Sequence, residues 1–150
     1  MSARGRGRGP ELYDITGPTS FTPLAFILFR AMTKILVIEN HADMREILVR
    51  ILDLMGFTAI TSKNGREGVE KALAEKPDLI VMDIMMPEIS GWEATRILRS
   101  NPETKDVPVL AATVLFRPTD LQRCINVGCN DYIVKPFTVK QLRRKIERLI

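Results

Sequence analysis

Five short apolar runs, each separated from the next by an amphipathic stretch, dominate residues 34–150. The runs are rich in β-branched residues and apolar throughout, which is typical of central parallel strands covered on both faces. They occupy residues 34–38, 57–61, 78–82, 107–112 and 131–134. This alternation predicts an α/β fold with a doubly wound, five-stranded parallel sheet. Right-handed crossovers would place the carboxyl end of every strand at one edge.

The stretches between these runs carry helix signals. In the first stretch, apolar residues recur at helical spacing from Met44 to Met55, and Gly56 follows where a C′ glycine ends a helix. The last helix is expected to begin at Thr138, with Gln141 three residues later at the spacing of a capping box. Three further helices are expected over residues 64–75, 90–100 and 119–127.

The first thirty-one residues differ in kind from the rest. Residues 2–9 contain an arginine-glycine alternation with too little apolar content to fold, and Pro10, Pro18 and Pro23 break any long helix after it. We interpret residues 1–31 as a disordered or dispensable leader and residues 32–150 as the folded domain, with Met32 as an alternative start. A nucleic-acid arm, a membrane-surface arm and a targeting segment are the other interpretations.

Composition is that of an ordinary globular protein, with 45% hydrophobic and 27% charged residues. The formal net charge is +4, and half of it comes from the first thirty residues, which gives little support for direct DNA binding. The apolar stretch at residues 21–29 is shorter than the roughly 20 residues that span a bilayer, so we expect no membrane partner. Cys124 and Cys129 lack the spacing of zinc sites and are expected to be reduced, packed thiols, as in a cytoplasmic protein.

Polar side chains stand at the ends of four of the five runs. Glu39 and Asn40 follow the first run, Asp83 the third, Thr113 the fourth, and Lys135 the fifth. In doubly wound sheets the site lies outside the carboxyl ends of the strands, at the point where the strand order switches. An ionised carboxylate held there beside a cationic group suits acceptance of a phosphoryl group.

Residues 34–150 resemble a response-regulator receiver domain of two-component signalling, of the chemotaxis-regulator type. The motifs lie at residues 37–40, at residues 81–87 with Gly91, at residues 111–113 and at residues 131–137. The resemblance implies a flavodoxin-like sheet with strand order 2-1-3-4-5. It also implies that Asp83 accepts a phosphoryl group from a sensor histidine kinase or a phosphotransfer protein in a phosphorelay.

The function expected from this resemblance is that of a single-domain response regulator. It would be a phosphoacceptor that assists its own phosphorylation and dephosphorylation, not an enzyme with a separate substrate. Its conformational switch would control the binding of a downstream protein, and the chain would be a monomer or a weak dimer.

The resemblance also implies a Mg²⁺ site made by Glu39 through water, Asn40, Asp83 and the backbone carbonyl of Met85. The family usually has a second acid where Asn40 stands, and an amide brings a dipole instead of a full charge. We therefore expect weakened Mg²⁺ affinity. Asp43 could partly substitute, although an exposed helix start is the favoured interpretation for Asp43, and a solvated helix start for His41.

Two other functions stay open. Because of Asn40, the chain could be a pseudo-receiver, a binding module that signals without phosphorylation. A nucleotide or flavin binder of the same topology is disfavoured, because no Gly-rich phosphate loop follows the first run.

Further roles follow from the resemblance. Lys135, ahead of a cis peptide at Pro136, would pair with Asp83 and then with the phosphoryl group, while Thr113 would donate its hydroxyl to a phosphoryl oxygen. Tyr132 would be the switch residue that responds to Thr113. The apolar residues Met85 and Leu115 would hold hydrolytic water poorly, which predicts a long-lived phosphoryl-aspartate. Trp92 is expected to be a packing residue, and the basic side chains of the last helix a charged outer face.

Overall fold

The computed structural model describes residues 22–150, and residues 1–21, with most of the expected leader, lie outside that part. The described residues form six helices and five strands. In chain order these are α1 (Pro23–Met32), β1 (Lys34–Ile38), α2 (Ala42–Leu54), β2 (Thr58–Ser62), α3 (Gly65–Glu75), β3 (Leu79–Asp83), α4 (Gly91–Ser100), β4 (Val109–Thr113), α5 (Pro118–Val127), β5 (Asp131–Val134) and α6 (Val139–Leu149). All five expected strands and all five expected helices are present, and α1 is additional.

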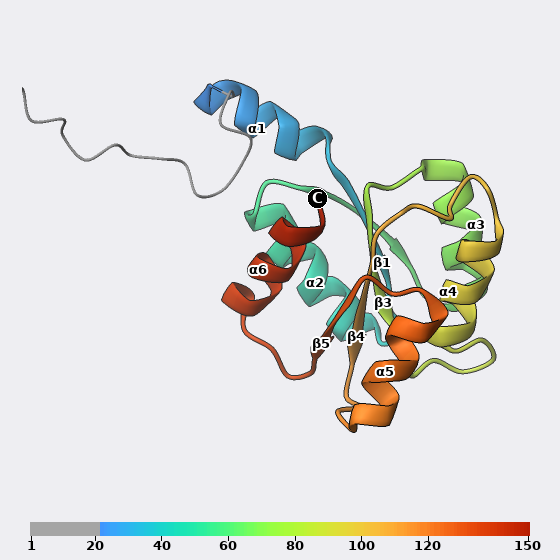
Figure 1. The fold of residues 1–150 in the computed structure, drawn as a ribbon. Helices are drawn as coiled ribbons and strands as arrows, with labels where there is room; N and C mark the ends of the chain where they lie inside the picture. Colours follow the sequence, from blue (N-terminus) through green and yellow to red (C-terminus); the bar gives the residue numbers. More distant parts are fainter. Residues whose placement is uncertain (1–21) are drawn as a thin grey trace, which may run out of the picture.

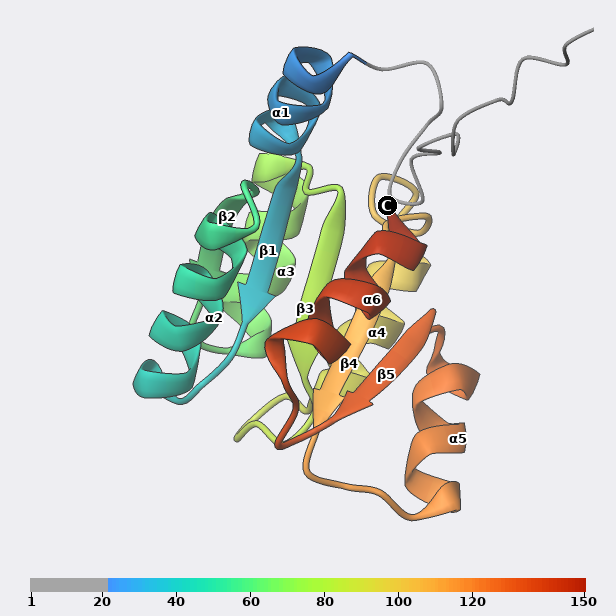
Figure 2. The same cartoon turned by 90° about the vertical axis from the view of Figure 1, so that its left-hand side faces the viewer.

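The strands form one parallel sheet in the order β2-β1-β3-β4-β5, which confirms the predicted topology. Strand β1 pairs with β2 on one side and with β3 on the other, so the strand order switches at β1. Ile38, the last residue of β1, is in register with Met82, which precedes the last residue of β3. Because all strands run the same way, as Figure 2 shows, the residues that follow β1 and β3 meet at one edge of the sheet.

Helices cover both faces of the sheet (Figure 1). On one face, Leu48 and Leu52 of α2 and Leu142 and Ile146 of α6 pack in one buried cluster with alternate strand residues. On the other face, side chains of α3, α4 and α5 form a second cluster with the remaining strand residues. Residues 35–38 of β1 are fully buried because they alternate between these two clusters, which explains the unbroken apolar run.

Helix ends follow the local sequence signals. Gly56 after α2 and Gly128 after α5 have φ angles of 89° and 109°, in the left-handed region that favours glycine. At the start of α6, the Thr138 side chain accepts from the Gln141 backbone N–H, and the Gln141 side chain accepts from the Thr138 backbone N–H. The predicted capping box is therefore confirmed.

The main difference from the sequence prediction is α1. The expected leader ends in this helix, which lies beyond the amino ends of the strands in Figures 1 and 2. Arg30 fastens it to the domain by donating to the Met55 carbonyl at 3.0 Å and to Glu147 at 2.8 Å. Residues 23–31 of the expected leader are thus helical. That the domain can dispense with them stays a prediction.

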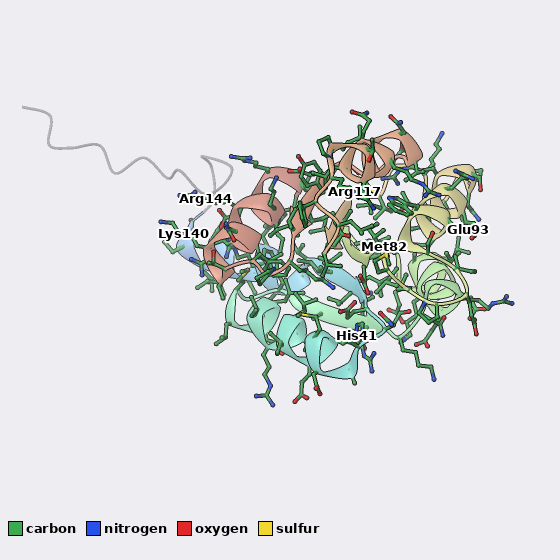
Figure 3. The ribbon with its side chains drawn as sticks, turned by 90° about the horizontal axis from the view of Figure 1, so that it is seen from below. His41, Met82, Glu93, Arg117, Lys140 and Arg144 are labelled. Carbon is green, nitrogen blue, oxygen red and sulfur yellow. The ribbon has the colours of Figure 1, made fainter. Side chains whose placement is uncertain are left out.

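Both cysteines are buried, as expected, and neither forms a disulfide. Trp92 packs against the second cluster and donates its indole N–H to the Cys124 sulfur at 3.3 Å, which is a packing role. The basic side chains Lys140 and Arg144 of α6 point away from the sheet in Figure 3. Among residues 22–150, no helix combines the length and the apolar character needed to cross a bilayer.

Candidate functional site

Asp83 is the last residue of β3, and the loop after it, residues 84–90, returns so that α4 begins against the end of the strand. Gly91, the first residue of α4, donates its N–H to the Ile84 carbonyl at 2.9 Å. A Cβ atom at position 91 would lie 2.2 Å from the Asp83 carbonyl oxygen, closer than any real side chain can stand. Glycine is therefore required for α4 to begin against the backbone of Asp83.

Lys135 connects the acidic groups that follow two different strands. Its Nζ atom lies 3.1 Å from Oε1 of Glu39 and 3.4 Å from Oδ1 of Asp83. The backbone N–H of Lys135 donates to the Thr113 carbonyl at 2.8 Å, and the Lys135–Pro136 peptide is cis, as predicted. The structure therefore brings Glu39, Asp83 and Lys135 together, and it ties Lys135 to the end of β4.

The two carboxylates outnumber the one ammonium, and three buried oxygens at this edge have no hydrogen-bond partner. They are Oε2 of Glu39, Oδ2 of Asp83 and Oδ1 of Asn40. Glu39 and Asp83 are 1% and 3% exposed, so water does not easily satisfy these atoms. Mg²⁺ prefers oxygen ligands, and buried carboxylate oxygens without partners are the groups that such an ion would satisfy. Three of the expected Mg²⁺ ligands therefore fit the ion.

Burial has a clear electrostatic effect on Glu39. Burial, first, and the neighbouring Asp83 carboxylate, second, raise the pKa of the Glu39 carboxyl, while the ammonium of Lys135 lowers it; together they bring this pKa to about 7. Two carboxylates that share one ammonium therefore resist being ionised together. A divalent cation at the free oxygens would offset this repulsion.

Thr113 is 1% exposed at the end of β4, and its hydroxyl oxygen accepts a hydrogen bond from the Leu115 backbone N–H at 3.0 Å. The hydroxyl proton is left for another acceptor, as the proposed contact with a phosphoryl oxygen requires. Tyr132 is half-buried on β5, and its ring lies 5.4 Å from Nζ of Lys145. It borders two surface hollows, one with residues of α5 and one with residues of α6.

A pocket of about 490 Å³ opens over the site. Its polar floor includes Glu39, Asp83 and Lys135, and its rim includes Met85 and Val114. These two rim residues are 52% and 56% exposed, so the entrance is apolar. Met85 lines the same pocket as Asp83. The roles of its carbonyl in metal binding and of Met85 and Leu115 in phosphate lifetime stay predictions.

His41 is the residue that sequence reasoning undervalued. Its side chain is 72% exposed at the start of α2, as a solvated helix start would be, yet its Nδ1 atom lies 3.8 Å from Oε1 of Glu39. One ligand atom from each of Glu39, His41 and Asp83 falls within 4.8 Å of the other two. The signal was the position of His41 immediately after Asn40, in the loop that follows β1. Asp43, in the first turn of α2, also borders the pocket.

Comparisons with known proteins agree with this geometry. The family model of the response regulator receiver domain matches residues 35–147. The probable transcriptional regulator ycf27 of Pyropia yezoensis is 36% identical over 117 residues, which cover 78% of this chain and 47% of that relative. The chain thus spans about half the length of the ycf27 relatives that it matches.

Two solved structures share the fold. The chemotaxis protein CheY4 of Vibrio cholerae is 28% identical, with a TM-score of 0.76 over 79% of this chain and 99% of that chain. The receiver domain of the sensor histidine kinase PA1611 of Pseudomonas aeruginosa PAO1 is 29% identical, with a TM-score of 0.73 over 78% of this chain and 96% of that chain. A magnesium ion is coordinated in its active-site cleft. On its sequence, topology and strand-end residues, this chain belongs to the response-regulator receiver domain family.

Proposed function

We propose that this receiver accepts a phosphoryl group on Asp83 and then changes conformation to bind a protein partner. The donor would be a phosphohistidine of a sensor kinase, or of a phosphotransfer protein in a phosphorelay. The observation that supports the proposal most directly is the buried Asp83 carboxylate, with Oδ1 3.4 Å from Nζ of Lys135 and Oδ2 unpartnered. One oxygen is thus held by a cation while the other is free to react.

The chemistry needs few groups. The free carboxylate oxygen attacks phosphorus, an oxygen–phosphorus bond forms, and the phosphorus–nitrogen bond to the donor imidazole breaks. Lys135 can pair first with the Asp83 carboxylate and then with the phosphoryl group, because an ammonium near Asp83 is also near the oxygens of a phosphoryl group attached there. Mg²⁺ held by Glu39, Asn40 and Asp83 would supply the remaining positive charge. The chain would thus be a phosphoacceptor that assists its own reaction, not an enzyme acting on a separate substrate.

Thr113 and Tyr132 would report phosphorylation to the surface. A phosphoryl oxygen on Asp83 would accept from the Thr113 hydroxyl and draw the loop after β4 inward. Tyr132 borders hollows against α5 and α6, so its ring has room on either side of β5. The phosphoryl group would shift the population between the two ring positions only as far as it binds one state better.

Asn40 makes the Mg²⁺ site weaker than one with an acid at that position. At about 4 Å a pair of unit charges is worth roughly 1 to 4 kcal/mol between bulk-water and near-surface dielectrics. We therefore expect weak Mg²⁺ affinity and slow phosphorylation. The same substitution favours the second candidate function, a pseudo-receiver that binds its partner without phosphorylation.

The decisive experiment measures intact mass after incubation with acetyl phosphate, with and without Mg²⁺. We expect the wild type to gain one phosphoryl group in the presence of Mg²⁺, Asp83→Asn to gain none, and Asn40→Asp to react faster. Asp78→Asn is the matched control, because it changes an aspartate at the opposite end of β3, where it accepts from the Lys34 backbone N–H. An adduct that persists in Asp83→Asn would refute the proposed acceptor. An adduct seen in Asn40→Asp but never in the wild type would favour the pseudo-receiver.

We also propose a compartment, partners and an oligomeric state for the chain. The reduced thiols and the donor chemistry suit a cytoplasmic protein. Histidine kinases or phosphotransfer proteins would be the upstream partners, and a protein would be the downstream one. We propose no direct contact with DNA or membranes, and a monomeric or weakly dimeric state.

A further inference from the structure

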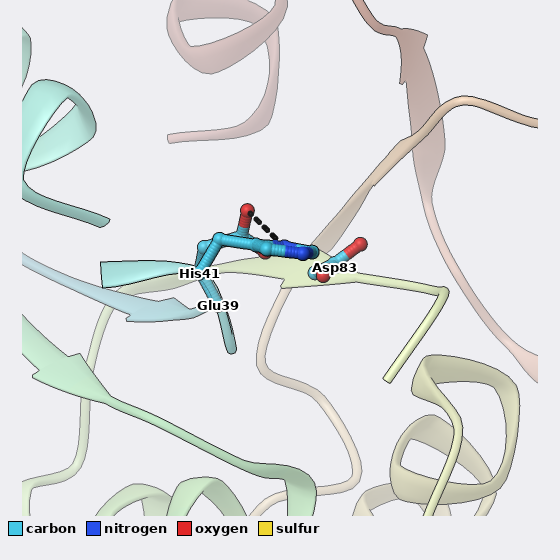
Figure 4. Close-up of side chains that lie close together, drawn as sticks. All are labelled: Glu39, His41 and Asp83. Carbon is cyan, nitrogen blue, oxygen red and sulfur yellow. Dashed lines mark ion pairs between the residues drawn. The ribbon is translucent and has the colours of Figure 1, made fainter. Parts of the chain in front are cut away.

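The loop after β1 offers the site a nitrogen atom that magnesium does not need. His41 follows Asn40 directly, and its imidazole extends from that loop toward Asp83, beside Glu39 (Figure 4). One donor atom each from Glu39, His41 and Asp83 lies within a common span of 4.8 Å. The set therefore holds two carboxylates and an imidazole where an all-oxygen site is expected.

The carboxylates have free atoms to contribute. Lys135 occupies Oε1 of Glu39 and Oδ1 of Asp83, while the second oxygen of each carboxylate is buried and has no hydrogen-bond partner. Both side chains are more than nine-tenths buried. These two buried oxygens without hydrogen-bond partners point to a cation, and they do so independently of the histidine.

The imidazole can reach the same ion. For metal–ligand bonds of about 2.1 Å, donor atoms around an octahedral ion stand about 3.0 Å apart in adjacent positions and about 4.2 Å apart in opposite ones. The observed span of 4.8 Å must close by less than the movement that one side-chain torsion provides. His41 is 72% exposed and is free to turn.

We propose that His41 ligates a divalent transition metal together with Glu39 and Asp83, so that this site prefers ions of the Co²⁺, Ni²⁺ and Zn²⁺ class to Mg²⁺. Imidazole suits these borderline ions, whereas Mg²⁺ prefers oxygen donors and keeps several waters. Asn40 also favours this preference, because an amide at that position offers Mg²⁺ a dipole in place of a charged carboxylate oxygen. The inference rests on the site of the proposed function and specifies its metal.

The direct test uses Cu²⁺, a paramagnetic ion that imidazole suits, as the probe, and pulsed electron paramagnetic resonance to detect a bound nitrogen. His41 is the only histidine of the chain, so a ¹⁴N modulation from a coordinated imidazole has one possible source. We expect the modulation in the wild type and its loss in His41→Gln. Glu46→Gln is the matched control, because it neutralises an exposed carboxylate of the same helix outside the pocket, and it should keep the signal.

Calorimetric titration then measures the preference. We expect Co²⁺ to bind the wild type more tightly than Mg²⁺, and His41→Gln to lose at least about tenfold in Co²⁺ affinity, since even outer-shell partners of metal ligands contribute that much. Cu²⁺ binding at the site without ¹⁴N modulation, an unchanged signal in His41→Gln, or no Cu²⁺ binding at all would each overturn the inference.

Phosphorylation is followed in the same samples by intact mass, so that the two proposals can fail separately. An adduct on Asp83 formed with Mg²⁺, together with metal binding through oxygen alone, would refute nitrogen ligation and leave the proposed function intact. Nitrogen ligation without an adduct under any cation would do the reverse.

Discussion

The two edges of the sheet, the amino edge where the strands begin and the carboxyl edge where they end, each hold a half-buried cation with different partners. At the amino edge, Arg30 is paired with one acid, Glu147, and it also donates to the Met55 carbonyl. Its guanidinium stands over the rings of Phe26 and Phe57, at 4.7 Å and 5.1 Å from their centroids. At the carboxyl edge, Lys135 is shared by two acids, and an oxygen of each is left without a partner.

The difference separates structure from function. The amino edge balances one positive charge with one negative charge and satisfies the donor groups around it, which is what holding α1 in place requires. The carboxyl edge leaves a negative charge and unsatisfied oxygens in a buried position, which costs free energy of folding. Proteins retain such a cost at sites where a bound ligand offsets it, and here a bound divalent cation would offset it.

The largest expected effect on stability comes from adding a side chain at Gly91, where α4 packs against the backbone of Asp83. Gly91→Ala would place a methyl group against the backbone of Asp83 and Ile84, so the start of α4 must move away. We expect a loss of about 3 kcal/mol in the free energy of unfolding, measured by urea denaturation, at the upper end of overpacking costs. Gly65→Ala is the control, because its nearest atom would be 3.2 Å away. Equal losses in the two variants would contradict the steric account.

A smaller loss is expected at the amino edge. Arg30→Ala removes the ion pair with Glu147, the hydrogen bond to Met55 and both aromatic contacts. We expect about 2 kcal/mol less stability and faster hydrogen exchange in α1. Glu147→Gln keeps the other contacts of Arg30 and should cost about 1 kcal/mol or less. An unchanged urea midpoint in Arg30→Ala would instead support the interpretation of residues 1–31 as dispensable.

At the carboxyl edge, removing a charge should have the opposite sign. Glu39→Gln leaves Lys135 with one carboxylate partner and relieves the repulsion between Glu39 and Asp83. We expect a gain of about 1 kcal/mol in the free energy of unfolding in chelator. Saturating divalent cation should stabilise the wild type more than the variant, because binding to the folded state adds stability by mass action. A loss of stability in chelator would show that Glu39 serves the fold more than the site.

The smallest effect on stability is expected at the pocket rim. Met85 is 52% exposed, so Met85→Asn should change the free energy of unfolding by no more than about 0.5 kcal/mol. The amide would hold a water molecule beside a phosphorylated Asp83, so loss of phosphate should be faster, and adding Leu115→Glu should make it faster still. The decay is followed by intact mass after the phosphodonor is removed. Equal decay in the wild type and the double variant would refute the lifetime prediction.

Much of the fold could be predicted because its signals are local. The helical spacing of apolar residues in α2, the capping box at Thr138 and the glycines at 56 and 128 each act within one or two turns of chain. The apolar runs likewise identify strands that are buried on both faces. The acceptor aspartate, the lysine and the threonine could be predicted because each stands at the end of such a run.

The sequence by itself thus determined the alternation of strands and helices and the edge at which Glu39, Asp83, Thr113 and Lys135 meet. Only the tertiary structure decided that α1 is held by an ion pair between residues 117 positions apart, and that the His41 imidazole comes within reach of the two carboxylates. It also decided that the Lys135 ammonium contacts both the Glu39 and the Asp83 carboxylates. The reason is physical: periodicity, caps and turns depend on neighbours along the chain, whereas ion pairs and ligand sets depend on side-chain packing between distant segments.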